Sequence, residues 1–259
     1  MAQQTPPKHY NNHLFSTKNQ ELIIGGVPLT QLAQRVGQSP FYAYDRRILT
    51  QSLVELRQQM PSDLKIHYAM KANPMPALVQ HMAGIVDGFD LASAKEMQTA
   101  LDTTMPAQQI SMAGPGKRPE EIKQAIAAEI TLNVESANEL ETIAKISNQT
   151  GIQAHVALRI NPAFELKSSG MKMGGGPKQF GIDEEQLPGI LKHLKTLNLD
   201  FIGFHIYSGS QNLKAESIIE AQQKSLSLAN KLSDLCPTAI KKLNLGGGYG
   251  IPYFPGETS

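Results

Sequence analysis

From residue 42 onward the chain alternates short apolar runs with longer segments whose apolar residues recur at helical spacing. Apolar runs of strand length that are joined by helices build a parallel β-sheet. The pattern predicts seven strands, at residues 66–70, 88–91, 110–113, 131–134, 155–160, 201–206 and 242–245. A (β/α)₈ barrel needs one strand more. We therefore expect an α/β fold, a TIM-type barrel that is incomplete at its C-terminus.

Several of the predicted helices begin at recognisable residues. Ser93 and Ser136 are each followed three residues later by Glu, which is the pattern of a capping box. Pro74 and Pro119 stand where the first helical residue is expected, a position that tolerates the missing N–H of proline. Apolar residues recur at helical spacing through residues 213–235, so this segment should form an outer helix on the sheet.

Two segments interrupt the alternation. Residues 1–45 are polar and proline-containing, with possible strands at 22–27 and 41–45 that lie outside the barrel. The loop at 161–181 is rich in Gly and Lys and exceeds the usual length of a connection, so it is either functional or mobile. We expect an N-terminal module at residues 1–45 and a barrel at 46–259 that stops before its last strand.

Composition and net charge limit the kinds of ligand that the protein is expected to bind. The 259 residues are 41% hydrophobic, enough for a substantial core, and the net charge of +1 gives no electrostatic reason to expect nucleic acid or a membrane surface. The single cysteine, Cys236, cannot form an internal disulfide, and no apolar run approaches the ~20 residues that cross a bilayer. The histidines show no metal-ligand spacing. We expect a cytoplasmic protein with small-molecule ligands and no metal.

Ligands of a parallel barrel bind at the C-terminal ends of the strands, and Lys71 follows the first of them. Strand alternation predicts that Lys71 shares the interior face with His67 and Ala69. An amine among apolar groups is more readily neutral, and the neutral amine condenses with an aldehyde. A lone lysine at a strand end is more commonly solvated, so Lys71 by itself decides nothing.

The glycines Gly246, Gly247 and Gly248 directly follow the last strand and could open a helix, a context in which bare N–H groups cradle a phosphate. A flexible turn is equally compatible with this run. The glycines at 174–176 lie far from any strand end, where a flexible turn is favoured.

Charged and aromatic residues complete the set at this end of the barrel. His205 and Tyr207 share a face of the sixth strand, where a ring can lie against a planar cofactor, and Ser210 follows with a hydroxyl that can bind a phosphate oxygen. Arg159 in an apolar strand requires an anionic partner, which Asp90 could supply. Each residue alone is explained by packing or capping, but together they match the needs of pyridoxal phosphate.

Five motifs occur in order along the chain: Tyr68–Asn73, Gly88–Ser93, Leu158–Pro162, His205–Gln211 and Asn244–Gly248. They resemble those of the fold-type III pyridoxal-phosphate decarboxylases, the ornithine/diaminopimelate/arginine decarboxylase group. The segments 165–181 and 251–256 are most similar to the decarboxylases associated with the exosortase A system, which belong to exopolysaccharide loci.

The resemblance implies an alanine racemase-like barrel, with the cofactor held as a Schiff base on Lys71. It implies further that Gly246 to Gly248 and Ser210 bind the cofactor phosphate, and that Asp90 and Arg159 orient groups near Lys71. Many relatives stack a histidine on the cofactor ring. Either His205 or Tyr207 can take that role here.

Family members continue beyond the barrel into a β-domain that supplies further cofactor contacts and reaches the site of a partner subunit. By this resemblance residues 1–45 belong to that β-domain, and the full-length protein is a homodimer. The chain alone is then expected to be poorly active or inactive.

Two other functions share the barrel and the Schiff-base lysine. One is a non-catalytic homeostasis protein that binds pyridoxal phosphate, and the other is an amino-acid racemase, which needs a catalytic tyrosine from the missing region. Residues 1–45 are explained if they pair with a further domain, as in the decarboxylases, so this segment favours the decarboxylase. Candidate substrates are a basic or diamino acid, or an amino acid tethered to a carrier protein.

Overall fold

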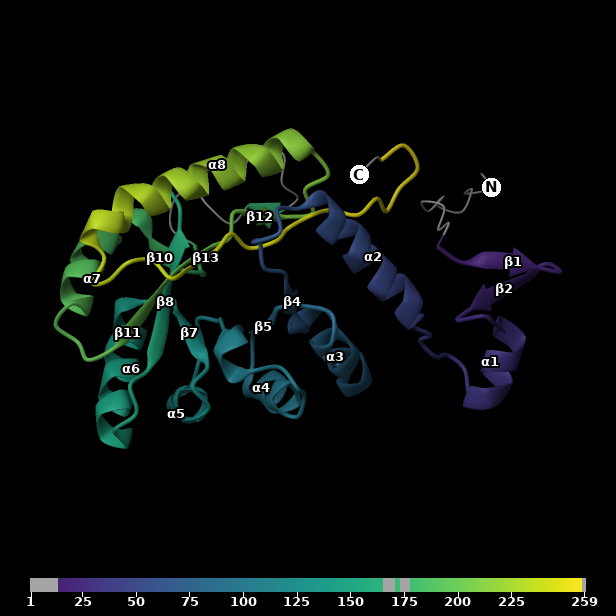
Figure 1. Cartoon of the computed structure of the whole chain (residues 1–259), viewed down its shortest axis with the longest axis horizontal. Coiled ribbons are helices and arrows are strands. Elements are labelled where there is room, and N and C mark those ends of the chain that lie inside the picture. The colour runs from purple at the N-terminus through teal and green to yellow at the C-terminus, as the bar shows by residue number, and fades with distance from the viewer. Residues whose placement is uncertain (1–13, 165–170, 173–177, 258–259) are drawn as a thin grey trace, which may run out of the picture. The chain divides into compact units, whose positions relative to one another are not determined.

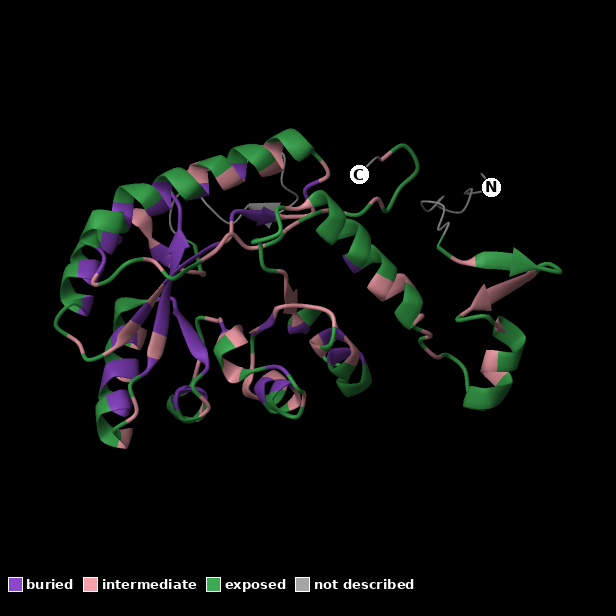
Figure 2. Ribbon diagram, in the orientation of Figure 1, coloured by how far each residue is buried: buried purple, intermediate pink, exposed green. Residues whose placement is uncertain are grey.

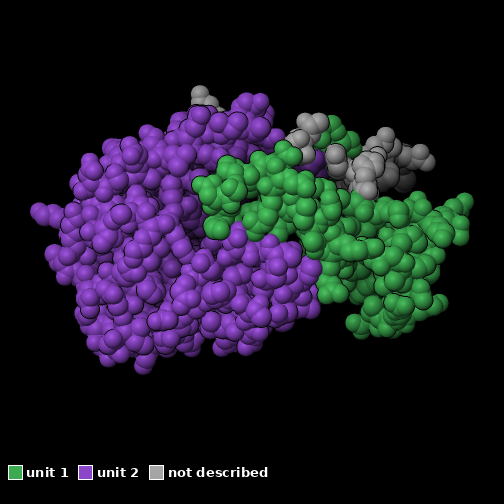
Figure 3. Space-filling view, viewed as in Figure 1, with its two compact units in different colours: residues 1–66, 253–257 green, residues 67–252, 258–259 purple. Residues whose placement is uncertain are grey.

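The computed structural model describes residues 14–164, 171–172 and 178–257. It divides into two compact units, residues 1–66 with 253–257 and residues 67–252 with 258–259, which are coloured separately in Figure 3. None of the helices in the described ranges has the length and hydropathy that a bilayer crossing requires.

The first unit holds a small antiparallel sheet of β1 (Ser16–Lys18), β2 (Glu21–Ile24) and β3 (Val27–Pro28). Two-residue turns join the strands, and all four turn residues, Asn19, Gln20, Gly25 and Gly26, have positive φ. Such turns match the twist of a hairpin. The strand predicted at 22–27 is confirmed for residues 22–24 only, because Gly25 and Gly26 form a turn and Val27 begins the next strand.

Helices α1 (Leu29–Val36) and α2 (Arg46–Gln59) complete the first unit. The strand predicted at 41–45 is wrong, because this segment is an extended connection with no paired neighbour among the described residues. Asp45 instead caps α2, since its Oδ1 accepts the N–H of Arg47 over 2.9 Å. Tyr42 shows why the apolar pattern misleads here: 91% of the residue is exposed.

The second unit is built on a sheet of parallel strands in the order β13-β11-β8-β7-β6-β5-β4, with β10 paired to the end of β8. The seven predicted strands are all present within two residues of their expected ends. The observed strands are β4 (His67–Ala69), β5 (Gly88–Leu91), β6 (Ile110–Met112), β7 (Thr131–Val134), β8 (His155–Asn161), β10 (Ile182–Asp183), β11 (Asp200–Ile206) and β13 (Lys242–Asn244).

This sheet is curled into part of a barrel. In a flat sheet β13 and β5 would stand about 24 Å apart at the usual strand spacing. Instead Asn244 at the end of β13 donates from Nδ2 to Oδ2 of Asp90 on β5 over 3.2 Å. Among the described residues β4 and β13 do not pair with each other, so the ring stays open between them. The expectation of an incomplete (β/α) barrel is confirmed.

Helices cover the outside of the curled sheet, and Figure 1 shows them in an arc around the strands. Figure 2 shows their buried residues on the side that faces the strands. The helices are α3 (Pro76–Ala83), α4 (Ala94–Leu101), α5 (Pro119–Ala127), α6 (Ala137–Thr150), α7 (Leu187–Leu194) and α8 (Ala215–Leu232), with 3₁₀ turns η2 (Ala107–Gln109), η3 (Glu184–Gln186) and η4 (Ser233–Leu235).

The two predicted serine caps are confirmed. Ser93 Oγ accepts the N–H of Glu96 over 3.2 Å, and Ser136 Oγ accepts that of Glu139 over 3.1 Å. The glutamates differ from a strict capping box, because each carboxylate accepts the N–H of the residue before the serine, as Glu96 does from Ala92. Each glutamate therefore ties its helix to the end of the preceding strand.

Of the two prolines expected to start helices, Pro119 begins α5 as predicted. Pro74 does not begin α3, which starts at Pro76 instead. Asn73 explains the shift, because its Oδ1 accepts the N–H of Met75 over 3.1 Å and makes a side-chain turn before the helix.

The long loop after β8 is described only at its two ends and at β9 (Met171–Lys172), which pairs antiparallel with β12 (Gly209–Ser210). The glycines at 174–176 lie outside the described residues. Gly246 to Gly248 follow β13 as expected, but no helix follows them within the described residues up to 257.

Candidate functional site

Lys71 lies in a single 3₁₀ turn, η1 (Met70–Ala72), directly after β4. Hydrogen bonds fix this turn: the Tyr68 hydroxyl donates to the carbonyl of Asn73 over 2.9 Å, and the Asn73 N–H donates to the carbonyl of Met70 over 3.1 Å. Met70 itself is fully buried and anchors the turn to the core. The lysine therefore stands on a held turn at the C-terminal end of a barrel strand, the edge at which barrels bind ligands.

The surroundings of Lys71 differ from the sequence-based expectation. The strand ends at Ala69, so the alternation of side chains between the two faces of the strand does not extend to Lys71. Contrary to the prediction from the sequence, Lys71 therefore does not share a strand face with His67. Lys71 is exposed, because β4 has a neighbour on one side only among the described residues. The expectation that apolar groups enclose its amine is therefore wrong for this structure.

The positive charge of Lys71 nevertheless affects a buried residue of the barrel, because it lowers the pKa of His205 near the end of β11. Burial, and then the positive charges of Arg159 and Lys71, lower the pKa of His205 to about 4 against the opposing pull of Asp90. The ring is therefore neutral at pH 7. Its Nδ1 is buried without a hydrogen-bond partner in the described part of the chain, which leaves a planar ring with one uncommitted nitrogen.

Asp90 on β5 is the centre of a polar network inside the barrel. Its Oδ1 accepts from the hydroxyl of Ser111 over 2.7 Å and lies 3.4 Å from Nδ1 of His67, while its Oδ2 accepts from Asn244. Burial alone would raise the pKa of Asp90. The hydrogen bond and charge of His67, with the charge that His205 carries once it is protonated at low pH, outweigh burial and lower this pKa. Asp90 is therefore a carboxylate at neutral pH.

The buried histidine predicts how stability depends on pH. Because the folded pKa of His205 is about 4 against 6.5 ordinarily, the unfolded chain binds more protons between these values. Its contribution is complete above pH 6.5 and falls away as pH drops toward 4, by roughly 3 kcal/mol. The depressed pKa of Asp90 adds a loss below pH ~4.

Urea unfolding of wild type and His205→Gln at pH 4 to 7 measures this effect. The variant should lose much less stability than wild type over that range. His193→Gln, at an exposed histidine on α7, is the control and should follow wild type. Parallel curves for wild type and His205→Gln would contradict the assignment.

Arg159 is paired with a different carboxylate from the one expected. Its Nη1 donates to Oε1 of Glu135 over 2.8 Å, and both side chains are at least nine-tenths buried, so the expected pair with Asp90 is wrong. Glu135 stands one residue beyond β7, the strand next to β8, which brings the two charges together. It also accepts the backbone N–H groups of Gly114 and Gly181. One carboxylate thus joins the loops that follow three neighbouring strands.

The glycine loop after β13 packs against the turn after β11 more closely than side chains would allow. A Cβ at Gly248 would meet the carbonyl oxygen of Gly209 at 1.9 Å, and one at Gly246 would meet the ring of Tyr207 at 2.6 Å. Gly246 and Gly248 also have positive φ, at 69° and 92°. At Gly247 a Cβ would meet nothing within 4 Å, so the middle of the loop borders open space. The backbone there is bare, as a phosphate cradle requires.

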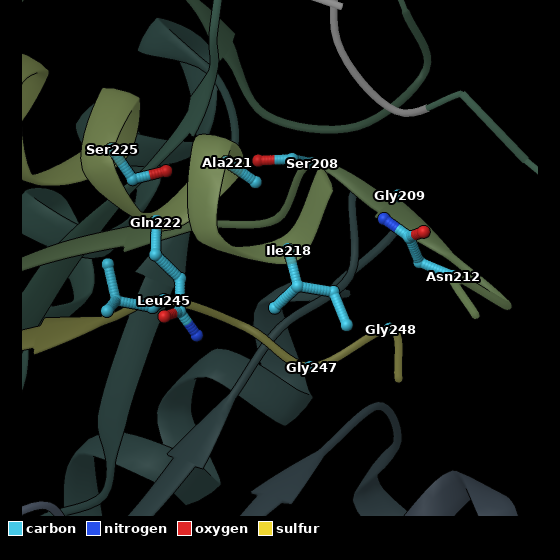
Figure 4. Close-up of a pocket in the computed structure, with 10 residues that line it drawn as sticks. All are labelled: Ser208, Gly209, Asn212, Ile218, Ala221, Gln222, Ser225, Leu245, Gly247 and Gly248. Carbon is cyan, nitrogen blue, oxygen red and sulfur yellow. The ribbon is translucent and has the colours of Figure 1, made fainter. Parts of the chain in front are cut away.

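A hollow of about 20 Å³, room for about one water molecule, lies between this loop and α8. Figure 4 shows Ile218 of α8 pointing toward the loop, with Gly247 and Gly248 on the opposite side. Ser208 lines the hollow and is buried, whereas Ser210 belongs to β12 and is not among the lining residues. Ser208 therefore lines the same hollow as the glycines, and Figure 4 shows its hydroxyl directed toward Ala221 of α8.

Sequence reasoning missed Glu135, Ser208 and Asn244. Glu135 and Asn244 each stand at or just past a strand end, the position from which Lys71 was selected, so the signal was present. Ser208 stands two residues before Ser210, and the sequence does not tell which of these two serines faces the glycine loop.

These residues fit pyridoxal phosphate: a primary amine on a held turn, a neutral ring in the interior, and bare glycine amides, all at the C-terminal ends of parallel strands. The family model of the pyridoxal-dependent decarboxylases, pyridoxal binding domain, matches residues 46–259. The chain belongs to this family, whose cofactor is pyridoxal 5′-phosphate, and the resemblance to fold-type III decarboxylases is confirmed.

Two curated relatives show how far the similarity extends. The L-glutamyl-(BtrI acyl-carrier protein) decarboxylase of Niallia circulans is 34% identical over 231 residues, covering 88% of this chain and 54% of the relative. The diaminopimelate decarboxylase of Aquifex aeolicus is 35% identical over 251 residues, covering 96% and 59%. The chain thus spans between half and three-fifths of the length of these relatives.

Solved structures agree with this assignment. The diaminopimelate decarboxylase of M. jannaschii superposes with a TM-score of 0.82 at 28% identity, over 93% of this chain and 58% of that one. The enzyme of Helicobacter pylori, complexed with L-lysine, gives 0.78 at 31% identity, over 86% and 57%.

Proposed function

We propose that this chain is the cofactor-binding barrel of a pyridoxal-phosphate-dependent amino-acid decarboxylase. The observation that carries the proposal is the family match across residues 46–259, with an amine and a glycine loop at the C-terminal ends of strands of one sheet. Pyridoxal phosphate supplies an electron sink for the bond to carbon dioxide. Decarboxylase relatives support this reaction over the racemase and the homeostasis protein.

Each residue of the site has a proposed task. Lys71 is the amine that binds the cofactor aldehyde and gives it up to the amino group of a substrate. Gly247 and Gly248 bind the phosphate through their N–H groups. A serine assists them, either Ser210, as the resemblance implies, or Ser208, which lines the same hollow as the glycines. His205 is the better candidate to lie against the cofactor ring, because the ring of Tyr207 contacts the glycine loop.

Hydrogen bonds hold the charged residues of the site in place. Asp90 remains ionised and holds His67 and Asn244, while Arg159 is fixed by Glu135. We propose that Asp90 and Arg159 orient groups near Lys71 without exchanging protons themselves.

The substrate is proposed to be a basic or diamino acid, by analogy with the diaminopimelate decarboxylases. A carrier-tethered amino acid is the second candidate, favoured by the relative from Niallia circulans. The homodimer, the exopolysaccharide link, the cytoplasmic location and the domain boundary at residue 45 stay predictions.

The test is release of carbon dioxide from carboxyl-labelled amino acids by the purified full-length protein with pyridoxal phosphate. Diaminopimelate, lysine, ornithine, arginine and carrier-bound glutamate cover both substrate classes. Release that requires the cofactor supports the proposal. Cofactor binding without any product would favour the homeostasis protein, and inversion of Cα would favour the racemase.

A further inference from the structure

Asn244, the last residue of β13, uses both ends of its side-chain amide. Its Nδ2 donates to Oδ2 of Asp90 over 3.2 Å, and its Oδ1 accepts the N–H of Gly246 over 2.8 Å. A donor and an acceptor on one short group are what asparagine offers, and a carboxylate or an aliphatic side chain cannot make both bonds. Asn244 is therefore a bridge between the charged centre of the barrel and the glycine loop.

The bond to Gly246 sets the direction in which the loop leaves the strand. A side-chain oxygen that accepts the N–H two residues later forms an Asx turn. Gly246 completes the turn at a φ of 69°, with its Cα against Tyr207. The loop path is thus fixed at its first residue.

The same bond decides which N–H groups remain for a ligand. The N–H of Gly246 is taken by Asn244, whereas those of Gly247 and Gly248 have no acceptor among the described residues. The carbonyl of Gly248 is held by the N–H of Asn212 over 2.9 Å, which fixes the far end of the loop. Two consecutive N–H groups therefore stand free in a loop held at both ends.

Building on the proposed function, we propose that Asn244 is a positioning residue, which holds the glycine loop in the conformation that binds the cofactor phosphate and ties this loop to Asp90. Asn244 itself does not touch the phosphate. Its effect is specific to ligands that carry a phosphate, because it acts through the N–H groups of the loop.

The experiment compares the affinity of the purified protein for pyridoxal phosphate and for pyridoxal, which lacks the phosphate, in wild type and Asn244→Ala. We expect the variant to bind pyridoxal phosphate about tenfold more weakly, the equivalent of one hydrogen bond. Its affinity for pyridoxal should not change. General damage to the fold would weaken both ligands together, so the ratio of the two affinities isolates the positioning role.

Asn133→Ala is the matched control. Asn133 is buried on β7 and donates to Ser111 over 3.1 Å, so it joins the network around Asp90 but has no bond to the glycine loop. The affinity ratio of this variant should equal that of wild type.

Three further outcomes are decisive. An unchanged ratio in Asn244→Ala, with wild type preferring pyridoxal phosphate, overturns this inference alone. Wild type that binds neither ligand overturns the proposed function and this inference with it. If Asn244→Ala does not fold, Gly246→Ala alters the same turn, because its Cβ would meet Tyr207 at 2.6 Å. An unchanged ratio there also overturns the inference.

Discussion

Replacing Lys71 by alanine in the full-length protein is expected to abolish the absorbance of covalently bound cofactor and to bring decarboxylation down to the level of the enzyme without cofactor. The reason is chemical, because the amine is the group that reacts with the cofactor aldehyde. The exposure of Lys71 makes the interpretation direct, since an exposed side chain on a surface turn can be removed with little effect on folding.

Lys95→Ala is the control for this prediction, because Lys95 is also exposed and the change in charge is the same. Both variants are measured by the absorbance spectrum after dialysis with pyridoxal phosphate and by release of carbon dioxide. A Lys71→Ala spectrum equal to that of wild type would show that another amine binds the cofactor.

Replacing Glu135 by glutamine is expected to give the largest loss of stability, about 3 to 5 kcal/mol. The change leaves the buried guanidinium of Arg159 without its counter-charge and weakens the bonds to Gly114 and Gly181. An uncompensated buried charge is costly, because little water reaches it. Urea or thermal unfolding of the purified variant measures the loss.

Glu141→Gln is the matched control, because Glu141 pairs with His193 on the surface, where 58% of its side chain is exposed. Exposed ion pairs contribute about 0 to 1 kcal/mol. The double variant Glu135→Leu, Arg159→Met should recover part of the stability by removing both charges together. A loss below about 1 kcal/mol in Glu135→Gln would mean that water or another group solvates Arg159.

The sheet could be predicted from the sequence because its signals are local. Runs such as 131–134 and 156–160 are buried throughout and mostly apolar, as expected of strands covered on both faces, although they include Asn133 and Arg159. Ser93 and Ser136 mark helix starts through bonds that span three residues. The location of Lys71, His205 and the glycine loop at one edge of the sheet could also be predicted, because the ends of parallel strands meet there.

The partners within the site could not be predicted with the same success. Arg159 pairs with Glu135 rather than Asp90 because the choice depends on which carboxylate the curled sheet brings within reach. Lys71 left the expected face because a 3₁₀ turn ended the strand at Ala69, one residue before its predicted end. The apolar run at 41–45 suggested a strand, but a strand also needs an edge to pair with, and the sequence pattern does not carry that information.

The bond between Asp90 and Asn244 joins residues that are 154 positions apart in the chain. Closing so long a segment costs conformational entropy, and the hydrogen bond that offsets this cost can form only when both residues are present. During synthesis on the ribosome, β5 emerges long before β13. The carboxylate of Asp90 therefore lacks its donor Asn244 until the chain has been synthesised as far as β13. The hydrogen bond that holds the sheet in this curvature, and so brings the proposed cofactor-binding residues together, is therefore among the last that a nascent chain can form.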